Sequence, residues 1–209
     1  MSLHIGDLAP NFTVDSTKGE INLYDWAGDS WVFFFSHPAD FTPVCTTEMG
    51  MTAKLAAEFE ARNTKPLGLS TDTVEEHLEW IKDVDETQDV SLNFPIVADP
   101  DLEIAKLYDM IHPDQSETAA VRSVFIIDPA KKIRLIMTYP MSVGRNFDEI
   151  LRVIDSLQLA DRAKVVTPAN WKPGGEVIIP PSISDDEAKE LFPQGFKTIK
   201  PYLRTTEVA

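Results

Sequence analysis

Residues 31–48 read Trp31-Val32-Phe33-Phe34-Phe35-Ser36-His37-Pro38-Ala39-Asp40-Phe41-Thr42-Pro43-Val44-Cys45-Thr46-Thr47-Glu48. The apolar run at residues 31–35 is typical of a buried strand. Thr42 and Pro43 then suit the N-cap and the first position of a helix. Cys45, the only cysteine in the sequence, therefore falls near a strand-to-helix junction, where the amides of a helix N-terminus favour a thiolate. A lone cysteine is more often a small buried apolar residue, but this position makes a reactive thiol the first hypothesis.

Strands and helices alternate along the first 160 residues. We expect strands at residues 20–23, 66–70, 94–98, 123–127 and 133–137, and helices at residues 46–62, 74–84, 102–107 and 147–157. Turn residues at 128–132 join the last two strands, which indicates an antiparallel pair. A parallel βαβ unit followed by such a pair and a helix predicts an α/β fold of thioredoxin type, with a mixed central sheet flanked by helices.

The sequence changes character after Ala160. Proline recurs at positions 168, 173, 180, 181, 193 and 201, around one acidic helix expected at residues 185–191. Because Trp171, Ile178 and Phe192 also occur here, packing is favoured over disorder. We therefore predict a first domain at residues 1–160 and a small C-terminal domain at residues 161–209.

The composition excludes several classes of protein. The chain has 34 acidic and 19 basic residues among 209, and its net charge of −15 argues against a nucleic-acid partner and against adhesion to anionic membranes. No apolar stretch approaches the ~20 residues of a membrane span. The first residues have neither the basic nor the apolar region of a secretory signal. One cysteine allows no internal disulfide, and together these features predict a cytoplasmic protein.

We expect neither a metal ion nor another cofactor. A four-cysteine metal site is impossible with one cysteine. Three of the four histidines, His4, His77 and His112, are dispersed along the sequence and do not suggest a set of metal ligands.

The spacing Pro38-x-x-x-Thr42-x-x-Cys45 resembles the active-site signature of peroxiredoxins, which are thiol peroxidases on a thioredoxin-like fold. The longer stretch at residues 36–48 resembles the one-cysteine, peroxiredoxin-6-type branch of that family. Further blocks follow in the same order at residues 122–129, 139–140, 144–152 and 171–173. The resemblance thus covers nearly the whole chain, and several blocks in order are far more specific than the short motif alone.

The resemblance implies a chemistry for the motif residues. The Cys45 thiolate attacks one peroxide oxygen, and the guanidinium of Arg122 favours the thiolate and binds the oxygens. The hydroxyl of Thr42 orients the peroxide, and Pro38 shields the sulfur without offering a competing N–H. From the residues alone, Thr42 could be only an N-cap, and Arg122 could be a solvated charge at a strand edge.

Three more residues join the expected site as a supporting network. The resemblance places Glu48 where it holds the arginines, and Arg145 within the same network. Arg145 immediately precedes the expected helix cap at Asn146, where the helix dipole disfavours a cation, so a specific partner is indicated. His37 lies beside the pocket in this branch, where it aids thiol activation or the later reduction, or is a structural histidine.

The oxidised protein needs a partner. Attack on peroxide leaves a sulfenic acid at Cys45, and no second cysteine in this chain can resolve it. The resemblance therefore implies an external thiol reductant, glutathione, thioredoxin or glutaredoxin, and a role in antioxidant defence and redox homeostasis. It also implies a homodimer or a larger homo-oligomer, with the C-terminal domain packing against a partner subunit.

Two other functions compete with the peroxidase. One is a redox-controlled chaperone or peroxide sensor, in which oxidation of Cys45 alters assembly. The other is a cysteine hydrolase that uses Cys45 and His37, but no orienting third residue is evident, and the pair of Thr42 and Arg122 suits cleavage of an O–O bond better than acyl transfer.

A second activity of the resembling branch is expected to be absent. Mammalian members are associated with a phospholipase A2 activity that needs a serine within Gly-x-Ser-x-Gly, a histidine and an aspartate. Here the matching stretch is Gly28-Asp29-Ser30-Trp31-Val32, and the other two positions read Tyr24 and Ala130. We therefore predict no phospholipase activity.

Overall fold

The structure, a computed structural model, describes residues 2–208. The chain divides into two compact units, one ending at Phe147 and the other beginning at Asp148. The boundary expected after residue 160 falls inside helix α6 (Phe147–Ala163). The composition changes near the end of this helix, whereas most of the helix itself belongs to the second unit.

The larger unit is built on a mixed sheet. Among the described residues it has seven strands in the order β2 (Gly19–Asn22), β1 (Thr13–Ser16), β5 (Ile96–Ala98), β4 (Thr64–Ser70), β3 (Trp31–Ser36), β6 (Arg122–Ile127) and β7 (Ile133–Tyr139). Strand β4 is parallel to both β3 and β5, whereas β6 is antiparallel to β3 and β7. The predicted thioredoxin-type arrangement is therefore confirmed. Strand β1, short and largely polar, lacks an apolar pattern and was not expected.

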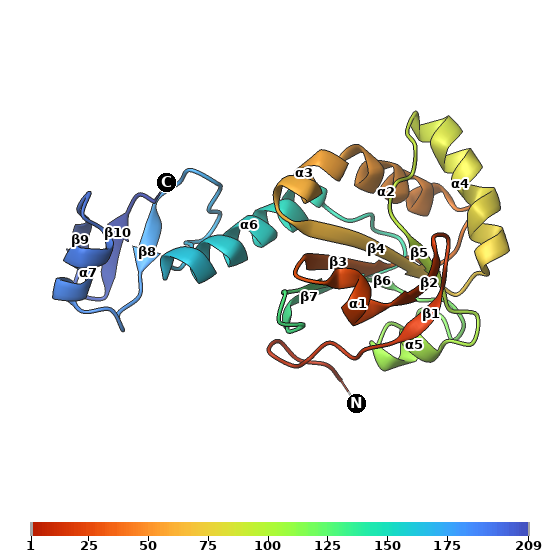
Figure 1. Cartoon of the computed structure of the whole chain (residues 1–209), viewed down its shortest axis with the longest axis horizontal. Coiled ribbons are helices and arrows are strands. Elements are labelled where there is room, and N and C mark those ends of the chain that lie inside the picture. Colours follow the sequence, from red (N-terminus) through yellow and green to blue (C-terminus); the bar gives the residue numbers. More distant parts are fainter. Residues whose placement is uncertain (1, 209) are drawn as a thin grey trace. The chain divides into compact units, whose positions relative to one another are not determined.

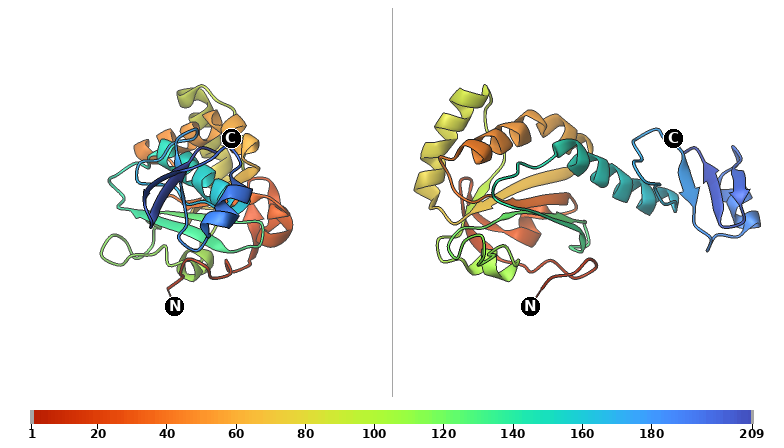
Figure 2. Two further views of the ribbon diagram at one scale, coloured as in Figure 1. Left: turned by 90° about the vertical axis from the view of Figure 1, so that its left-hand side faces the viewer. Right: turned by 180° about the vertical axis from the view of Figure 1, so that it is seen from behind.

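Helices cover both faces of this sheet. Helices α2 (Pro43–Lys54), α3 (Ala56–Ala61) and α4 (Val74–Gln88) lie on one side, and α1 (Leu23–Ala27) and α5 (Glu103–Leu107) lie on the other (Figures 1 and 2). The single helix expected at residues 46–62 is wrong, because Leu55 leaves the helical conformation and separates α2 from α3. After this break the ring of Phe59 stacks on Phe33, with 5.3 Å between centroids.

Strand β3 is buried on both faces, which explains its continuous apolar sequence. The rings of Phe33 and Phe35 stack on one face, with centroids 4.5 Å apart. Phe34 points to the other face and meets the edge of Tyr108 at 4.9 Å. Because side chains alternate along a strand, this packing fixes the direction in which β3 ends and delivers the chain to the start of α2.

The smaller unit contains most of α6 and a second sheet. Strands β8 (Val177–Ile179), β10 (Leu203–Thr206) and β9 (Lys197–Lys200) pair antiparallel in that order, beside helix α7 (Asp185–Leu191). Its core joins Leu159 of α6 to Trp171, Val177, Ile179 and Phe192, which confirms that this segment packs. Only α7 was expected here, since the three strands are short. No helix among residues 2–208 is long and apolar enough to cross a membrane.

Candidate active site

Cys45 is fully buried in the first turn of α2. The helix begins at Pro43 with Thr42 in the N-cap position, as expected. The side chain of Thr42 does not cap the helix, however, because its hydroxyl donates to the carbonyl of Ala39 at 2.8 Å. Its oxygen is thus held by the preceding loop, and its lone pairs remain available to a ligand.

Arg122 binds the sulfur directly. Its Nη1 lies 3.3 Å from Cys45 Sγ, and the same nitrogen donates to Glu48 Oε2 at 2.8 Å. Its Nε and Nη2 both donate to the carbonyl of Met141, at 3.0 and 2.9 Å. Arg122 is buried at the start of β6, so it is not the solvated edge charge that the sequence left open.

Glu48 holds both arginines, one helical turn after Cys45. Its Oε1 accepts hydrogen bonds from the backbone amide of Arg145 at 2.9 Å and from Arg145 Nε at 3.0 Å. Its Oε2 accepts from Arg145 Nη2 at 2.5 Å. The remaining Nη1 of Arg145 reaches the carbonyls of Ser36 and Ser123, at 2.8 and 3.2 Å. The partner expected for Arg145 is therefore a buried carboxylate.

The charges of this cluster do not balance. Two guanidinium groups and one carboxylate leave a net positive charge beside the buried sulfur. Burial lowers the pKa of Arg145 from its ordinary value, and the charge and hydrogen bonds of Glu48 oppose that effect. The guanidinium also lies 4.8 Å from the centroid of the Phe35 ring, which supplies a further favourable contact.

The loop at residues 37–42 links β3 to α2 and carries Pro38 and Thr42, both half-buried. Phe41 has a positive φ of 54°, a strained conformation for a bulky residue, and its side chain is 53% exposed. The structure brings Cys45, Glu48, Arg122 and Arg145 into one bonded network. Pro38 and Thr42 are near it in sequence, with Pro38 in this loop and Thr42 at the N-cap of α2.

His37 belongs to a different buried cluster. Its Nε2 lies 2.8 Å from Asp40 Oδ1, and Asp40 Oδ2 lies 2.6 Å from His77 Nδ1. His77, which the sequence placed among dispersed histidines, is thus a partner of the same carboxylate as His37. Asp40 and His77 were missed as site residues. The His37-x-x-Asp40 spacing could have indicated the first contact, but His77 comes from α4 and had no local signal.

The pKa values in this second cluster shift for opposing reasons. Burial lowers the pKa of His37 below 6.5, although the bond to Asp40 works against this change. Burial works to raise the pKa of Asp40, but hydrogen bonds from the two histidines outweigh it and leave the pKa below 3.8. Asp40 is therefore a carboxylate, and His37 is a neutral ring at neutral pH.

One group of side chains has the spacing of metal ligands. Ligand atoms of His37, Asp40 and Asp72 lie within 4.8 Å of one another. Hydrogen bonds already account for this spacing, because Asp72 Oδ2 accepts from the Asp40 amide at 2.9 Å and from Ser70 Oγ at 2.6 Å. The geometry therefore requires no ion.

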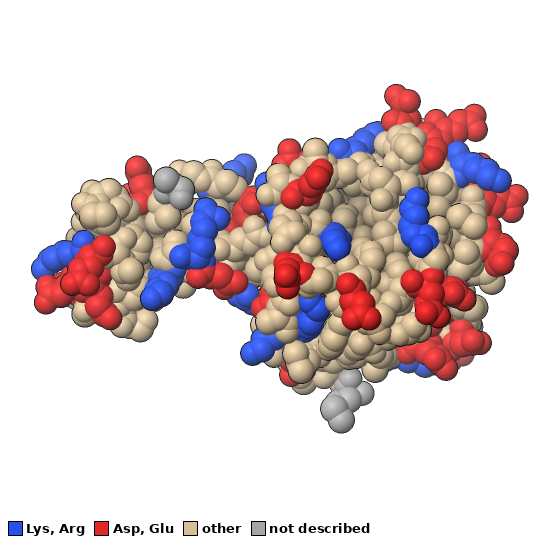
Figure 3. All heavy atoms as spheres, in the orientation of Figure 1, with Lys and Arg blue, Asp and Glu red and all other residues tan. Residues whose placement is uncertain are grey.

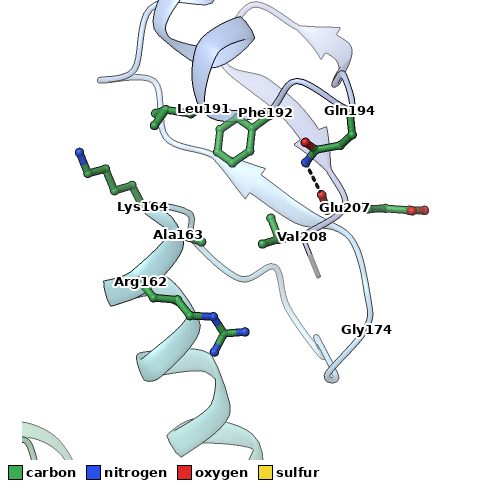
Figure 4. A pocket seen from close by; sticks show the side chains of 9 residues that line it. All are labelled: Arg162, Ala163, Lys164, Gly174, Leu191, Phe192, Gln194, Glu207 and Val208. Carbon is green, nitrogen blue, oxygen red and sulfur yellow. Dashed lines mark hydrogen bonds between the residues drawn. The ribbon is translucent and has the colours of Figure 1, made fainter.

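A cavity of about 670 Å³ lies within the smaller unit (Figure 4). Its walls combine apolar side chains, including Leu191, Phe192 and Val208, with Arg162 and Lys164. Gln194 is fixed at its edge by donating to the carbonyl of Glu207 at 2.7 Å. The residues that line it include no cysteine.

The surface charge agrees with the composition. In the larger unit, acidic side chains gather at the end where α4 lies, with single basic side chains between them (Figure 3). This face offers no basic stripe of the kind that binds a phosphate backbone.

Comparison with known proteins finds similar sequences and structures along both units of the chain. The model of the AhpC/TSA family matches residues 5–136, and the model of the C-terminal domain of 1-Cys peroxiredoxin matches residues 156–195. A 1-Cys peroxiredoxin of Dictyostelium discoideum is 57% identical over 204 residues, which cover 98% of this chain and 85% of that protein. Peroxiredoxin-6 of Gallus gallus is 51% identical over 217 residues, covering 98% and 97%.

A solved structure extends the likeness to three dimensions. The yeast mitochondrial 1-Cys peroxiredoxin, studied for its thiol resolving mechanism via glutathione/thioredoxin systems, is 55% identical. It aligns with a TM-score of 0.94 and covers 99% of this chain and 100% of its own. Both units of the present chain therefore have counterparts in that protein.

Proposed function

Because this chain belongs to the AhpC/TSA family and to its one-cysteine peroxiredoxin branch, we propose roles for its residues in peroxide reduction. The protein is a thiol peroxidase that reduces hydrogen peroxide and organic hydroperoxides. Cys45 is the only cysteine of the sequence, which supports it as the catalytic thiol. The 3.3 Å approach of Arg122 Nη1 to Cys45 Sγ is the observation that carries the assignment of roles.

The reaction begins with a two-electron oxidation of the sulfur. The thiolate of Cys45 attacks one oxygen of the hydroperoxide, an S–O bond forms, and the O–O bond breaks. The other oxygen leaves as hydroxide or alkoxide, which takes up a proton to give water or an alcohol. Cys45 is left as a sulfenic acid.

Arg122 has two functions in this step. Its positive charge favours the thiolate, and its Nη groups stabilise the charge that moves onto the leaving oxygen. Glu48 fixes the guanidinium of Arg122 at 2.8 Å, and Arg145 donates to both oxygens of the same carboxylate. Glu48 and Arg145 thus support the site by holding Arg122 in place.

The loop before α2 positions the substrate. Thr42 orients the peroxide through its hydroxyl, which the carbonyl of Ala39 already fixes in direction. Pro38 shields the sulfur and offers no N–H that competes for peroxide oxygen. His37, at the first position of this loop, contributes a buried ring nitrogen that aids activation of the thiol or the later reduction of the oxidised cysteine.

The second half of the cycle uses an external thiol. A thiol attacks the sulfenic sulfur, an S–S bond forms, and the oxygen leaves as water. A second thiol then cleaves the mixed disulfide and regenerates Cys45. We propose glutathione, thioredoxin or glutaredoxin as the source. The systems named for the yeast mitochondrial relative, glutathione and thioredoxin, support the first two.

Turnover with each reductant tests this cycle. The protein is mixed with excess hydrogen peroxide and with glutathione, thioredoxin or glutaredoxin, each with its reductase. We expect repeated turnover with at least one of them, and mass spectrometry of the trapped intermediate finds the added oxygen on Cys45. A single oxidation without turnover under all three conditions favours the peroxide sensor or redox-controlled chaperone instead.

The assembly and the compartment are also proposals. We propose a homodimer in which the segment at residues 161–209 packs against a partner subunit, and light scattering of the purified protein tests it. A monomer at micromolar concentration contradicts this assignment.

We propose the cytoplasm as the compartment, and cell fractionation discriminates it from the mitochondrion, where the yeast relative resides.

A further inference from the structure

A carboxylate lies between two imidazoles below the loop at residues 37–42. Asp40 is in that loop, His37 follows the end of β3, and His77 comes from α4. The distances are 2.8 Å from Asp40 Oδ1 to His37 Nε2 and 2.6 Å from Asp40 Oδ2 to His77 Nδ1. All three side chains are buried. The cluster therefore joins the loop at residues 37–42 to α4 through Asp40.

The partners of each ring nitrogen assign the protons. His77 Nδ1 lies 2.6 Å from Asp40 Oδ2 and donates to that carboxylate. His77 Nε2 lies 3.2 Å from the carbonyl of Val97. The same reasoning places the single proton of neutral His37 on Nε2.

In this arrangement one ring nitrogen, His37 Nδ1, carries no proton. His37 Nδ1 is buried and has no hydrogen-bond partner among the residues that the structure describes. Buried polar atoms without a partner are rare, and each one calls for an explanation. A bare ring nitrogen fits a ligand that carries an O–H or S–H donor, and both the hydroperoxide and the reducing thiol carry one.

The polar groups around His77 come from the loop at residues 37–42, from β5 and from α4. Asp40 and His37 face it from the loop, while the carbonyl of Val97 faces it from β5. Glu76 precedes it on α4 and is exposed, where it caps the helix by binding Thr73. Asp72 interacts electrostatically with His37. Asp40 is thus the one carboxylate in hydrogen-bond contact with the His77 ring among these groups.

We propose that His77 is a positioning residue for peroxide reduction by Cys45. Through Asp40 it fixes the proton of His37 on Nε2, and it anchors the loop that carries Pro38 and Thr42. This inference rests on the proposed function of that loop. The strained backbone of Phe41, φ 54°, is in the same loop, and such a conformation persists only where its surroundings hold it.

Two substitutions of His77 distinguish the loss of its hydrogen bond to Asp40 from the loss of its side-chain volume. In His77→Asn the side-chain amide replaces Nδ1 and still donates to Asp40, whereas in His77→Gln the amide replaces Nε2 and leaves Asp40 Oδ2 unpaired. We expect His77→Gln to slow the reaction of Cys45 with hydrogen peroxide by about tenfold or more, and His77→Asn by less than about threefold. Val84→Ala is the control, since it opens a cavity on the same helix without touching the cluster.

Nitrogen NMR of the histidine rings supplies a readout that a structural defect does not move. At neutral pH we expect a proton on His77 Nδ1, which faces Asp40, and His37 protonated only on Nε2. In His77→Gln, part of the His37 population moves its proton to Nδ1, whereas Val84→Ala keeps the wild-type pattern. If His77→Gln fails to fold, the wild-type NMR spectrum and the peroxide kinetics of His77→Asn still test the proposal.

Either of two results overturns the proposal: a His37 proton on Nδ1 in the wild type, or wild-type peroxide kinetics in a folded His77→Gln. Failure of the peroxidase function is distinct from both, because the wild-type protein itself then reacts no faster than free cysteine.

Discussion

The Nη1 nitrogen of Arg122 lies 3.3 Å from Cys45 Sγ although the two residues are 77 positions apart in sequence. The contact exists because β6 pairs with β3 in the sheet, while β3 leads into the helix that carries Cys45. The same nitrogen donates to Glu48, so the arginine is fixed before a substrate arrives. Preorganised donors of this kind stabilise developing charge without reorganising during the reaction.

Substitution of Arg122 tests this contact. Arg122→Lys keeps the charge but loses the forked donors, and Arg122→Ala loses both. A hydrogen bond to a charged group contributes about 1.5–3 kcal/mol, so we expect Arg122→Ala to react with peroxide about 10- to 100-fold more slowly. We expect the rate of Arg122→Lys to lie between the rates of Arg122→Ala and the wild type. Stopped-flow kinetics measure the rates, and an unchanged rate in a folded Arg122→Ala removes this residue from the site.

Glu48 is central to stability because it pairs with two buried guanidinium groups. Loss of one partner from a buried ion pair costs about 3–5 kcal/mol, and we expect Glu48→Gln to lower the free energy of unfolding by that amount. Urea denaturation measures it. The matched control is Glu58→Gln, which breaks the exposed pair with Arg62 and changes stability by less than about 1 kcal/mol. Equal effects of the two substitutions contradict the assignment.

Substitution of Thr42 distinguishes a role in catalysis from a role in capping the helix. Its hydroxyl binds Ala39 and not the helix amides, so Thr42→Val slows peroxide reduction while changing the free energy of unfolding by less than about 1 kcal/mol. Thr73→Val is the opposite case, because Thr73 caps α4 in a capping box. We expect it to lose about 0.5–2 kcal/mol of stability with unchanged kinetics. Thr42→Val with wild-type kinetics contradicts the proposed role.

The buried His37 makes stability depend on pH. Its folded pKa lies below 6.5, so the unfolded chain binds more protons than the native protein as the pH falls. The contribution of His37 is complete above pH 6.5 and is lost as the pH falls toward the folded pKa, by about 1.4 kcal/mol for each pH unit. Asp40, whose folded pKa lies below 3.8, adds a further loss in stronger acid.

Urea denaturation of the wild type and of His37→Asn, carried out from about pH 7.5 to about pH 5, tests this dependence. We expect the free energy of unfolding to fall more steeply with decreasing pH in the wild type, because the variant lacks the titrating ring of His37. Parallel curves for the two proteins contradict a buried neutral His37.

Ser30 is unsuited to lipid hydrolysis. Its hydroxyl donates to Asn63 Oδ1 at 2.9 Å, and Tyr24, at the expected histidine position, donates its hydroxyl to the carbonyl of Ala9. A serine nucleophile needs a base to accept its proton, and an amide oxygen is too weak a base for that. We expect no release of fatty acid from phospholipid vesicles above the level of a Ser30→Ala control. Release that depends on Ser30 refutes this prediction.

Much of the larger unit could be predicted because its signals are local. The apolar run of β3, the Thr42-Pro43 helix start and the hairpin between β6 and β7 each follow from neighbouring residues. Helix α7 begins at Asp185 and ends at Leu191 as expected, with Ser184 and Glu187 forming a capping box. Strong local propensity and the final fold agree at these positions.

The features that could not be predicted depend on distant contacts. The pairing of His77 with Asp40 joins residues 37 positions apart, and no local pattern marks it. The break at Leu55 separates two helices within one continuous helical pattern. Strands β8 to β10 are three or four residues long and gain their stability from the core around Trp171. Tertiary packing overrides weak local preference in each case.

Stopped-flow consumption of hydrogen peroxide by the wild type and by Cys45→Ser tests most directly whether Cys45 is the activated nucleophile. We expect the wild type at neutral pH to react at least about 100-fold faster than free cysteine, since a preorganised set of donors surrounds the sulfur. Cys45→Ser should consume no peroxide. A wild-type rate no faster than free cysteine, or an equal rate for Cys45→Ser, contradicts this assignment.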